Sequence, residues 1–385
     1  MYISILGRQP AIGIAELERL YQDVTWFSET TAIINTKDFD FERLGGTQKA
    51  GRIVAEIPSG DWRRASMKLV QAYEQAWNDV EGKITLGISA FGFDVSPRDV
   101  QKTGIILKGK LKQHGVSLRL IPNAEAALNT ATSHHNKLGL SNNKVELLVV
   151  RGKNGKIIIA ESVGSQNITA LARRDQERPK RDAFVGMLPP KLAQIMVNLA
   201  HPPAGGRVLD PFCGTGVILQ EAALMGYKVY GTDLTDKMID YSKVNIEWLD
   251  TSLRNDIDIT LHQGDAIDTQ WHAPIDAVAC ESYLGQPFSA PPSPAKLADV
   301  RKNCNYIISS FLKNIGQQIK TGTPLSIAIP AWRSTDGSFT HLPLIRELES
   351  IGYAQYEFKN VRNEELLYYR EEQVVARELL VLIKT

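Results

Sequence analysis

The first 165 residues combine two hydrophobic periods, which predicts a region of mixed α and β structure. Apolar residues either alternate with polar ones, as in half-buried strands, or recur every three to four positions, as on one face of a helix. The predicted strands are residues 2–6, 31–35, 53–57, 84–93, 145–150 and 156–161, and the predicted helices are residues 12–21, 67–77 and 100–115. Asn154-Gly155 is a strong turn signal, so we expect the last two strands to form a hairpin.

From Pro189-Pro190 onward, helix-like and strand-like segments alternate regularly. An amphipathic helix is expected to follow the two prolines, and further helices are predicted at residues 217–225, 237–249 and 305–321. The predicted strands are residues 207–210, 228–233, 257–263, 275–280 and 324–329, with a terminal hairpin of residues 357–361 and 378–383. This alternation predicts a mostly parallel, doubly wound α/β sheet whose site lies at the carboxyl ends of the strands.

A chain of 385 residues is too long for one typical hydrophobic core, so two or three domains are expected. Residues 165–185 carry mixed charges and a proline, which is typical of a connector between domains. We therefore predict α+β domains at residues 1–60 and 61–164, a linker at residues 165–185, and a Rossmann-like α/β domain at residues 186–385.

Composition adds little about the partner but narrows the class of protein. Hydrophobic residues make up 43% and charged residues 23%, as in a globular protein, and the net charge of +1 argues neither for nor against a nucleic-acid partner. The start of the chain lacks the pattern of a signal peptide, and no run approaches the ~20 apolar residues of a membrane span. The three cysteines lack zinc-site spacing, and His134-His135 has no accompanying ligands, so the sequence predicts no metal site. An odd, sparse set of cysteines suggests a reducing compartment, so we expect a cytoplasmic protein.

Two local clusters of basic residues stand out from this neutral background. Residues 96–120 contain six Lys or Arg side chains and one acid, which suggests contacts with phosphates. A solvated helix face explains the same composition equally well. The predicted RNA-binding residues in this helix and in the connector are Arg98, Lys102, Lys108, Lys110, Lys112, Arg173, Arg174, Arg178, Lys180 and Arg181.

The segment from Asp210 to Gly216 is the strongest chemical signal in the chain. A predicted strand ends at Asp210, two glycines allow a tight turn, and a helix follows at once. Glycine is needed where backbone passes close to a ligand, and a helix N-terminus offers free N–H groups. The third glycine of a dinucleotide-binding loop is replaced by Leu219, which argues against an NAD-dependent oxidoreductase. Asp-x-Phe-x-Gly-x-Gly suits a nucleoside that carries an amino acid.

Two further acids stand at the ends of the next two predicted strands. Asp233 follows Gly214 by 19 residues, where a carboxylate can hold both ribose hydroxyls, and Asp265 is placed to read the adenine amino group. Three strand-end acids in succession predict a site for S-adenosylmethionine (SAM). The predicted cofactor-binding residues are Asp210, Phe212, Gly214, Gly216, Asp233, Leu234, Asp265 and Ala266.

This arrangement resembles the class I methyltransferases. The segments Arg174–Arg181 and Leu188–Ala200 are similar to the connector and first helix of the THUMP-containing tRNA guanine-N2 methyltransferases, which modify the guanosine at position 10 of tRNA. Leu6–Pro10 resembles that family's N-terminal ferredoxin-like domain, and Leu367–Glu378 its C-terminal strand pair. Residues 61–164 match a THUMP domain by size, place and basic character. The resemblance implies tRNA as the partner, and the built-in RNA-binding domains favour a monomer.

The family's catalytic signature, Asp-Pro-Pro-Tyr-Gly, is altered in this chain. Glu281-Ser-Tyr-Leu-Gly285 stands in its place, so only the glycine is retained. By resemblance, Glu281, Tyr283 and Leu284 are the candidate catalytic positions. Three outcomes stay open: methylation of a guanine amine by an altered carboxylate, methylation of a different RNA atom, or binding of RNA and SAM without turnover. The basic N-terminal half and the connector argue against a DNA amino-methyltransferase.

Overall fold

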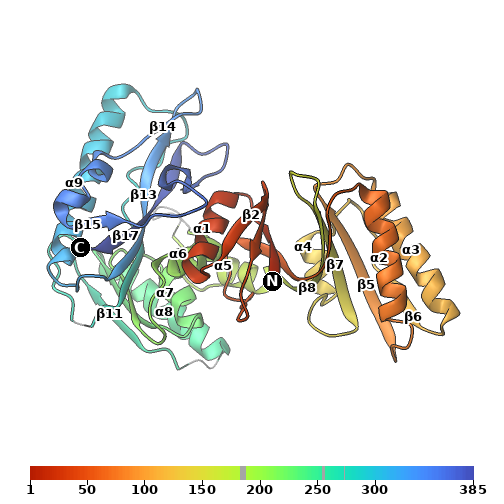
Figure 1. The fold of residues 1–385 in the computed structure, drawn as a ribbon. Coiled ribbons are helices and arrows are strands. Elements are labelled where there is room, and N and C mark those ends of the chain that lie inside the picture. Colours follow the sequence, from red (N-terminus) through yellow and green to blue (C-terminus); the bar gives the residue numbers. More distant parts are fainter. Residues whose placement is uncertain (183–187, 254–255, 273) are drawn as a thin grey trace. The chain divides into compact units, whose positions relative to one another are not determined.

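The computed structural model describes residues 1–182, 188–253, 256–272 and 274–385. Within them the chain forms two compact units, each with its own sheet (Figure 1). The first comprises Met1–Leu17 and Tyr21–Ala170, and the second comprises Glu18–Leu20 and Leu171–Thr385. No helix among these residues is both long enough and apolar enough to span a membrane.

The first unit is built on one mixed sheet of eight strands in the order β2-β3-β1-β4-β8-β7-β5-β6. Strands β5, β6 and β7 are mutually parallel, whereas the other pairings are antiparallel. The elements are β1 (Tyr2–Leu6), α1 (Pro10–Leu20), β2 (Val24–Ser28), β3 (Thr31–Ile34), β4 (Thr47–Ile57), α2 (Trp62–Ala76), β5 (Lys83–Phe91), α3 (Pro97–Gln113), β6 (Ser117–Leu120), α4 (Thr130–His135), β7 (Lys144–Arg151) and β8 (Ile157–Ser165).

Helices α2 and α3 lie side by side along one face of this sheet (Figure 1). Each begins at a side-chain cap: Asp61 accepts a hydrogen bond from the backbone of Arg64, and Ser96 from that of Asp99. Their apolar faces bury Leu69 and Leu107 against the strands, which explains why both helices form where the sequence shows helical periodicity. The sheet takes strands from both predicted N-terminal domains, since β4 pairs with β8.

The second unit contains the predicted doubly wound sheet, in the order β11-β10-β9-β12-β13-β17-β15. The pairs from β11 to β13 are parallel, and β17 is antiparallel to β13. The elements are α5 (Ile168–Gln176), α6 (Pro190–Ala200), β9 (Arg207–Asp210), α7 (Val217–Leu224), β10 (Lys228–Asp233), α8 (Asp236–Leu253), β11 (Ile259–Gln263), β12 (Ala277–Glu281), α9 (Pro294–Gly316), β13 (Pro324–Arg333), β14 (Phe339–Thr340), β15 (Tyr353–Gln355), β16 (Leu367–Tyr368) and β17 (Val375–Lys384).

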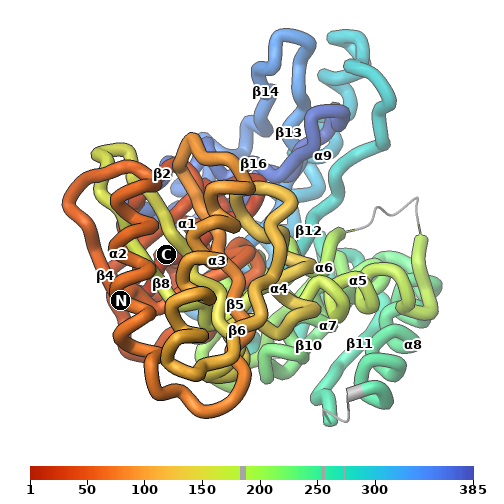
Figure 2. The backbone as a smooth tube through the Cα atoms, turned by 90° about the vertical axis from the view of Figure 1, so that its right-hand side faces the viewer, coloured from red at the N-terminus to blue at the C-terminus, as the bar shows by residue number. Residues whose placement is uncertain are grey.

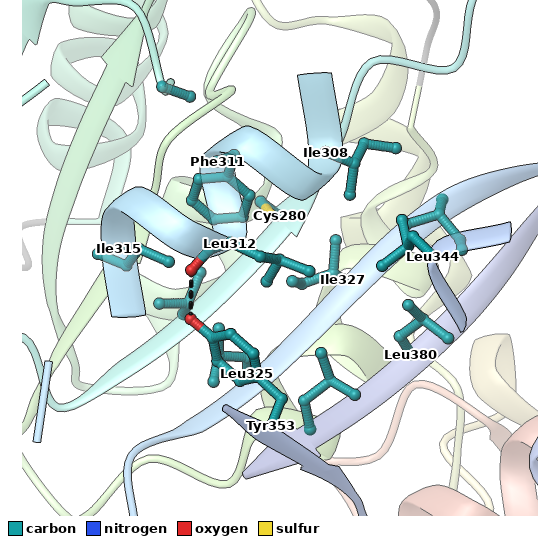
Figure 3. Packing of buried hydrophobic residues seen from close by; sticks show 14 of the residues in the cluster. Cys280, Ile308, Phe311, Leu312, Ile315, Leu325, Ile327, Leu344, Tyr353 and Leu380 are labelled. Carbon is teal, nitrogen blue, oxygen red and sulfur yellow. Dashed lines mark hydrogen bonds between the residues drawn. The ribbon is translucent and has the colours of Figure 1, made fainter. Parts of the chain in front are cut away.

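Helices α6, α7 and α8 cover one face of the second sheet, and α9 covers the other (Figure 2). Figure 3 shows the core beneath α9, where Phe311 and Leu312 pack against side chains of β12 and β13 such as Cys280 and Ile327. The Tyr353 hydroxyl donates a 2.7 Å hydrogen bond to the backbone oxygen of Leu312, so its one polar atom is satisfied within this core. This packing fixes the strands whose ends carry the predicted site.

Several elements differ from the sequence predictions. Residues 357–361 do not form a strand: β17 pairs instead with β13, β15 and β16. The backbone N–H groups of Lys359 and Asn360 donate to the carboxylate of Glu18, so they are not available to a sheet. Strands β2 and β6 and the six-residue helix α4 were not predicted. Nine residues of the predicted connector form helix α5, Ile168–Gln176, and residues 183–185 of it lie outside the described residues.

Candidate active site

The loop between β9 and α7 adopts the strand–turn–helix geometry that its sequence predicts. Gly214 and Gly216 have φ angles of +51° and +80°, values that side chains other than glycine's rarely allow. A Cβ atom at Gly216 would lie 2.9 Å from the Ser242 hydroxyl oxygen, so this glycine also lets α7 approach α8 closely. The loop is tied to the neighbouring strand by a 2.9 Å bond from the Cys213 N–H to the backbone oxygen of Thr232.

Asp233 lies beside this loop at the end of β10. Its Oδ2 accepts a 3.0 Å hydrogen bond from the Gly214 N–H, and its Oδ1 accepts one of 3.1 Å from the Thr235 N–H. The carboxylate is therefore held in one orientation at the carboxyl edge of the sheet. Leu234, the next residue, is 62% exposed, so an apolar side chain borders this carboxylate on the solvent side.

Asp210 is a buried carboxylate with too few partners to stabilise its charge. Its Oδ1 accepts a 3.1 Å hydrogen bond from the Phe212 N–H. Burial raises the pKa of Asp210 well above its usual range, and the nearby acids Asp233 and Glu281 raise it further against the opposing effect of that bond. A cationic group placed beside Asp210 would relieve this unfavourable charge.

Asp265 and Ala266 follow β11 at the same edge of the sheet. Asp265 Oδ1 accepts from the Ile267 N–H at 3.1 Å, and the Asn314 amide donates to the Ala266 oxygen at 3.2 Å. Phe212 packs edge-on against Phe311, with ring centroids 5.2 Å apart. The structure thus brings all three strand-end acids to one edge, as the sequence predicts from the parallel topology.

Glu281 ends β12 and lines a small cavity of about 40 Å³ together with Asp210. The loop residues Phe212, Gly214 and Thr215 line the same cavity. On its other side, Glu281 accepts a hydrogen bond through Oε1 from the Nε of Arg377 on β17, and the two side chains are 14% and 10% exposed. Arg377 was not predicted as a site residue; the signal was the pair of adjacent charged residues Arg377 and Glu378 within the mostly apolar strand β17.

Residues after Glu281 follow a different path from the one that two prolines would impose. The backbone N–H and the hydroxyl of Ser282 both donate to the Ala328 oxygen at 2.9 Å, which extends the pairing with β13. Tyr283 is 42% exposed, and neither it nor Leu284 lines the cavity that Glu281 shares with Asp210. At Gly285 φ is +80° and a Cβ atom would meet Val300 at 2.8 Å, which explains why this position needs glycine.

The residues at this edge fit the nucleoside that carries an amino acid. Asp210 supplies a buried carboxylate that needs a positive neighbour, which suits an ammonium or sulfonium group. Asp233 supplies a fixed acceptor for hydroxyl groups, and the glycine loop allows close approach. Each of these groups is held by the fold itself, so the site is pre-organised.

The predicted RNA-binding residues of α3 lie beside a groove in the first unit. This cavity of about 590 Å³ is formed by the end of α3 and the starts of β5 and β6. Four cationic residues line it, and among the described residues that do so none is acidic: Lys83, Lys108, Lys112 and Arg119. Arg98 and Lys102 lie earlier on α3, and Lys110 forms a 2.6 Å ion pair with Glu74. Lys83 comes from β5 and was missed because it is isolated in sequence.

Three basic residues of the connector, Arg173, Arg174 and Lys180, contact side chains of the second unit. The Arg174 guanidinium donates two hydrogen bonds, of 2.6 and 3.0 Å, to the buried Glu221 carboxylate. Arg178 is 3% exposed. Arg174 is thus engaged by Glu221 and Arg178 is buried, and their role as RNA contacts stays a prediction. Arg173 stacks over Trp248 at 5.6 Å, and the Lys180 N–H donates to Asn245.

Arg181 also lies in the connector and takes part in interactions within the structure. Both Lys180 and Arg181 are at the surface of the second unit. Lys180 approaches the Tyr241 ring at 5.4 Å. The connector thus contacts α7 and α8 through Arg174, Arg173 and Lys180, and the prediction that its exposed basic residues contact RNA stays a prediction.

Comparisons with known proteins agree with this geometry. Residues 178–282 match the RMKL-like methyltransferase domain. The chain is 30% identical over 179 residues to the tRNA (guanine(10)-N2)-dimethyltransferase of Methanothermobacter thermautotrophicus, covering 46% of this chain and 49% of that protein. It is 28% identical over 252 residues to the enzyme of the same name from Pyrococcus abyssi, covering 64% of this chain and 67% of that one. The first match thus spans about half of the relative.

A solved structure with the same fold covers the whole chain. TrmN from Thermus thermophilus superposes with a TM-score of 0.52 at 18% sequence identity, covering 100% of this chain and 99% of its own. At that identity the likeness concerns the fold alone. The segment that matches the RMKL-like methyltransferase domain begins in the connector and ends just after Glu281, so it contains the glycine loop and the three strand-end acids. The part of the second unit that holds the glycine loop and the strand-end acids is thus similar to the RMKL-like methyltransferase domain.

Proposed function

We propose that the protein transfers methyl groups from SAM to the exocyclic N2 amine of a guanosine in tRNA, at position 10 by resemblance. The observation that carries this proposal is the placement of the Glu281 carboxylate beside Asp210 and the glycine loop, in one cavity at the carboxyl edge of the sheet. The relatives named tRNA (guanine(10)-N2)-dimethyltransferases support the choice of base and amine.

Each acid has a separate role in this chemistry. Asp210 and Asp233 hold the cationic and ribose parts of SAM, which supplies an electrophilic methyl group. Glu281 accepts a hydrogen bond from the target amine, whose lone pair is delocalised into the base and needs orientation. A bond forms between N2 and the methyl carbon as the carbon–sulfur bond breaks, and the amine proton leaves to Glu281 or to water. Asp265 and Ala266 are assigned to the adenine.

The first unit is proposed to bind the tRNA. Its groove of four cations suits a run of phosphates, and the predicted ferredoxin-like and THUMP-like domains would share its single sheet. With tRNA as partner, we propose a cytoplasmic protein that acts as a monomer.

Charge reversal in this groove should weaken tRNA binding. We expect Lys108→Glu combined with Lys112→Glu to lower tRNA affinity by about tenfold or more and to flatten its salt dependence, because two phosphate contacts become repulsive. Filter binding at several salt concentrations measures both effects. Lys153→Glu is the matched control, since Lys153 is an exposed lysine of the same unit outside the groove. Equal loss in both variants would contradict a specific role for the groove.

The proposed activity has a direct test. The wild-type protein is incubated with SAM carrying a labelled methyl group and an unmodified tRNA transcript, and the digested RNA is analysed by mass spectrometry. We expect N2-methylguanosine or its dimethyl form, and no label in a transcript whose guanosine 10 is replaced by adenosine. Label in another nucleoside would reject the proposed target and favour a retargeted enzyme.

A second candidate is a tRNA-binding protein without turnover. The observations that favour it are the ion pair that engages Glu281 and the absence of a stacking tyrosine at Leu284. A wild-type protein that binds both SAM and tRNA, yet transfers no methyl group to a broad tRNA pool, would establish this candidate instead.

A further inference from the structure

The Glu281–Arg377 pair joins two strands that are not neighbours in the sheet. In the order β9-β12-β13-β17, Glu281 lies on β12 between Asp210 on β9 and Arg377 on β17. Glu281 thus faces the cavity on one side and the guanidinium on the other. The main-chain register places Ala328 opposite Glu281 and Pro330 opposite Arg377, so β13 separates the two backbones. The positions of both residues are fixed by the pairing of β12 and β17 with β13.

Only part of each charged group is used by this contact. Arg377 donates through Nε to Oε1 of Glu281, and among the described residues its side chain has no other hydrogen-bond partner. Unlike those of Arg178, its terminal amino groups are not among the fully buried side-chain atoms that lack a partner in the described part of the chain. Oε2 of Glu281 likewise has no hydrogen-bond partner within the described part of the chain. Among the described residues, none therefore takes up Oε2 of Glu281 or the terminal N–H groups of Arg377 beside it.

We propose that Arg377 determines, together with Glu281, which edge of the target base is read. This inference rests on the proposed function. Oε2 of Glu281 accepts a hydrogen bond from the target amine, and a terminal N–H of Arg377 donates to the ring nitrogen beside that amine.

In guanine, the N2 amine is flanked by N1, which carries a proton, and by N3, which is an acceptor. The Glu281 carboxylate accepts from the N2 amine, and the neighbouring Arg377 N–H can donate to N3. On the other side of the amine, N1–H is itself a donor and cannot accept from the guanidinium. The pair thus assigns the N3 side of guanine to Arg377. Arg377 also neutralises Glu281, which would otherwise be an unpaired charge at a site that is mostly shielded from water.

The test compares guanosine with 3-deazaguanosine at the target position of a ligated tRNA, because the analogue keeps the N2 amine and replaces N3 by a C–H group. For the wild type, we expect kcat/KM for methyl transfer to be about 10- to 100-fold lower with the analogue, as for loss of one hydrogen bond to a charged group. For Arg377→Met, transfer to guanosine should fall by a similar factor, and the analogue should cost at most about twofold more. The loss caused by the analogue and the loss caused by Arg377→Met then do not add, because both remove the same hydrogen bond.

Controls separate this role from a structural one. Arg377→Lys keeps the charge and should retain part of the discrimination, and SAM affinity should be unchanged in both Arg377 variants. Glu378→Gln is the matched control: Glu378 is the next residue of β17, is buried, and pairs with His341 at 2.7 Å. It should discriminate between the two bases as the wild type does, even if the strand is weakened.

Two outcomes overturn the proposal in distinguishable ways. A wild-type protein that methylates guanosine and its 3-deaza analogue equally well would refute the role of Arg377 and leave the proposed function standing. Additive losses in Arg377→Met would do the same, because Arg377 would then act only by holding Glu281. A wild-type protein that binds SAM but transfers no methyl group to guanosine would refute the proposed function, and this assignment with it.

Discussion

Glu281→Gln is expected to lower methyl transfer to tRNA by about 100-fold or more while SAM affinity changes by less than about twofold. Glutamine has nearly the shape of glutamate, so the cavity and strand β12 keep their geometry. It lacks the negative charge that accepts the amine hydrogen bond and pairs with Arg377. A positioned acid or base contributes about 10²–10⁴ in rate, and the substitution removes that contribution at the reacting atom.

Single-turnover transfer from labelled SAM measures this effect, and calorimetry measures SAM affinity. Glu281→Asp is the matched variant, because it keeps the charge and shortens the side chain by one methylene, as in the signature of the family that the sequence resembles. We expect it to retain more transfer than Glu281→Gln. Undiminished transfer by Glu281→Gln would remove Glu281 from the chemistry.

Asp210→Asn is expected to weaken SAM binding by about 10- to 100-fold. The substitution removes a buried negative charge that is proposed to face the cationic part of SAM, and hydrogen bonds to charged groups contribute about 1.5–3 kcal/mol. Asparagine retains an oxygen that can accept from the Phe212 N–H, so the turn itself is preserved. Calorimetric titration of both proteins with SAM provides the comparison. Equal affinities would show that Asp210 serves only the turn.

The same substitution should have the opposite effect on the stability of the protein without SAM. The pKa of Asp210 is raised in the folded protein, so its contribution to stability is fully present below its unfolded value near 3.8. That contribution is lost as the pH rises through the higher folded pKa, because the buried carboxylate must then carry its charge. We expect Asp210→Asn to melt at a higher temperature than the wild type at pH ~8, with the difference disappearing toward pH ~4. Added SAM should raise the melting temperature of the wild type more than that of Asp210→Asn, because the wild type binds SAM more tightly.

The methyltransferase-like unit could be predicted well because its decisive signals are local. Strands β9 and β10 have the predicted bounds, since each is a short apolar run ended by an acid and a turn. Parallel βα alternation then places Asp210, Asp233 and Asp265 at the same edge of the sheet, so their proximity could be predicted without any long-range contact.

Contacts between distant segments could not be predicted in the same way. Arg377 meets Glu281 across 96 positions of sequence, and nothing in the local pattern of either residue indicates the other. Arg174 likewise has the composition of a phosphate contact, but a buried glutamate on α7 takes its guanidinium. Residues 357–361 resemble a strand in composition, yet the Glu18 carboxylate binds their N–H groups. In each case a tertiary partner decided the outcome.

The pairing of β4 with β8 limits how the chain can be divided for expression. Its register runs from Lys49 opposite Ser165 to Ile57 opposite Ile157. A strand that precedes the predicted domain boundary at residue 60 is therefore paired with a strand that follows it. A fragment that begins at residue 61 would lack β4, so β8 would keep β7 as a partner but expose its other edge, and an exposed apolar edge invites aggregation. Fragments meant to isolate RNA binding from catalysis should therefore keep residues 1–170 together, so that β4 and β8 remain in one piece.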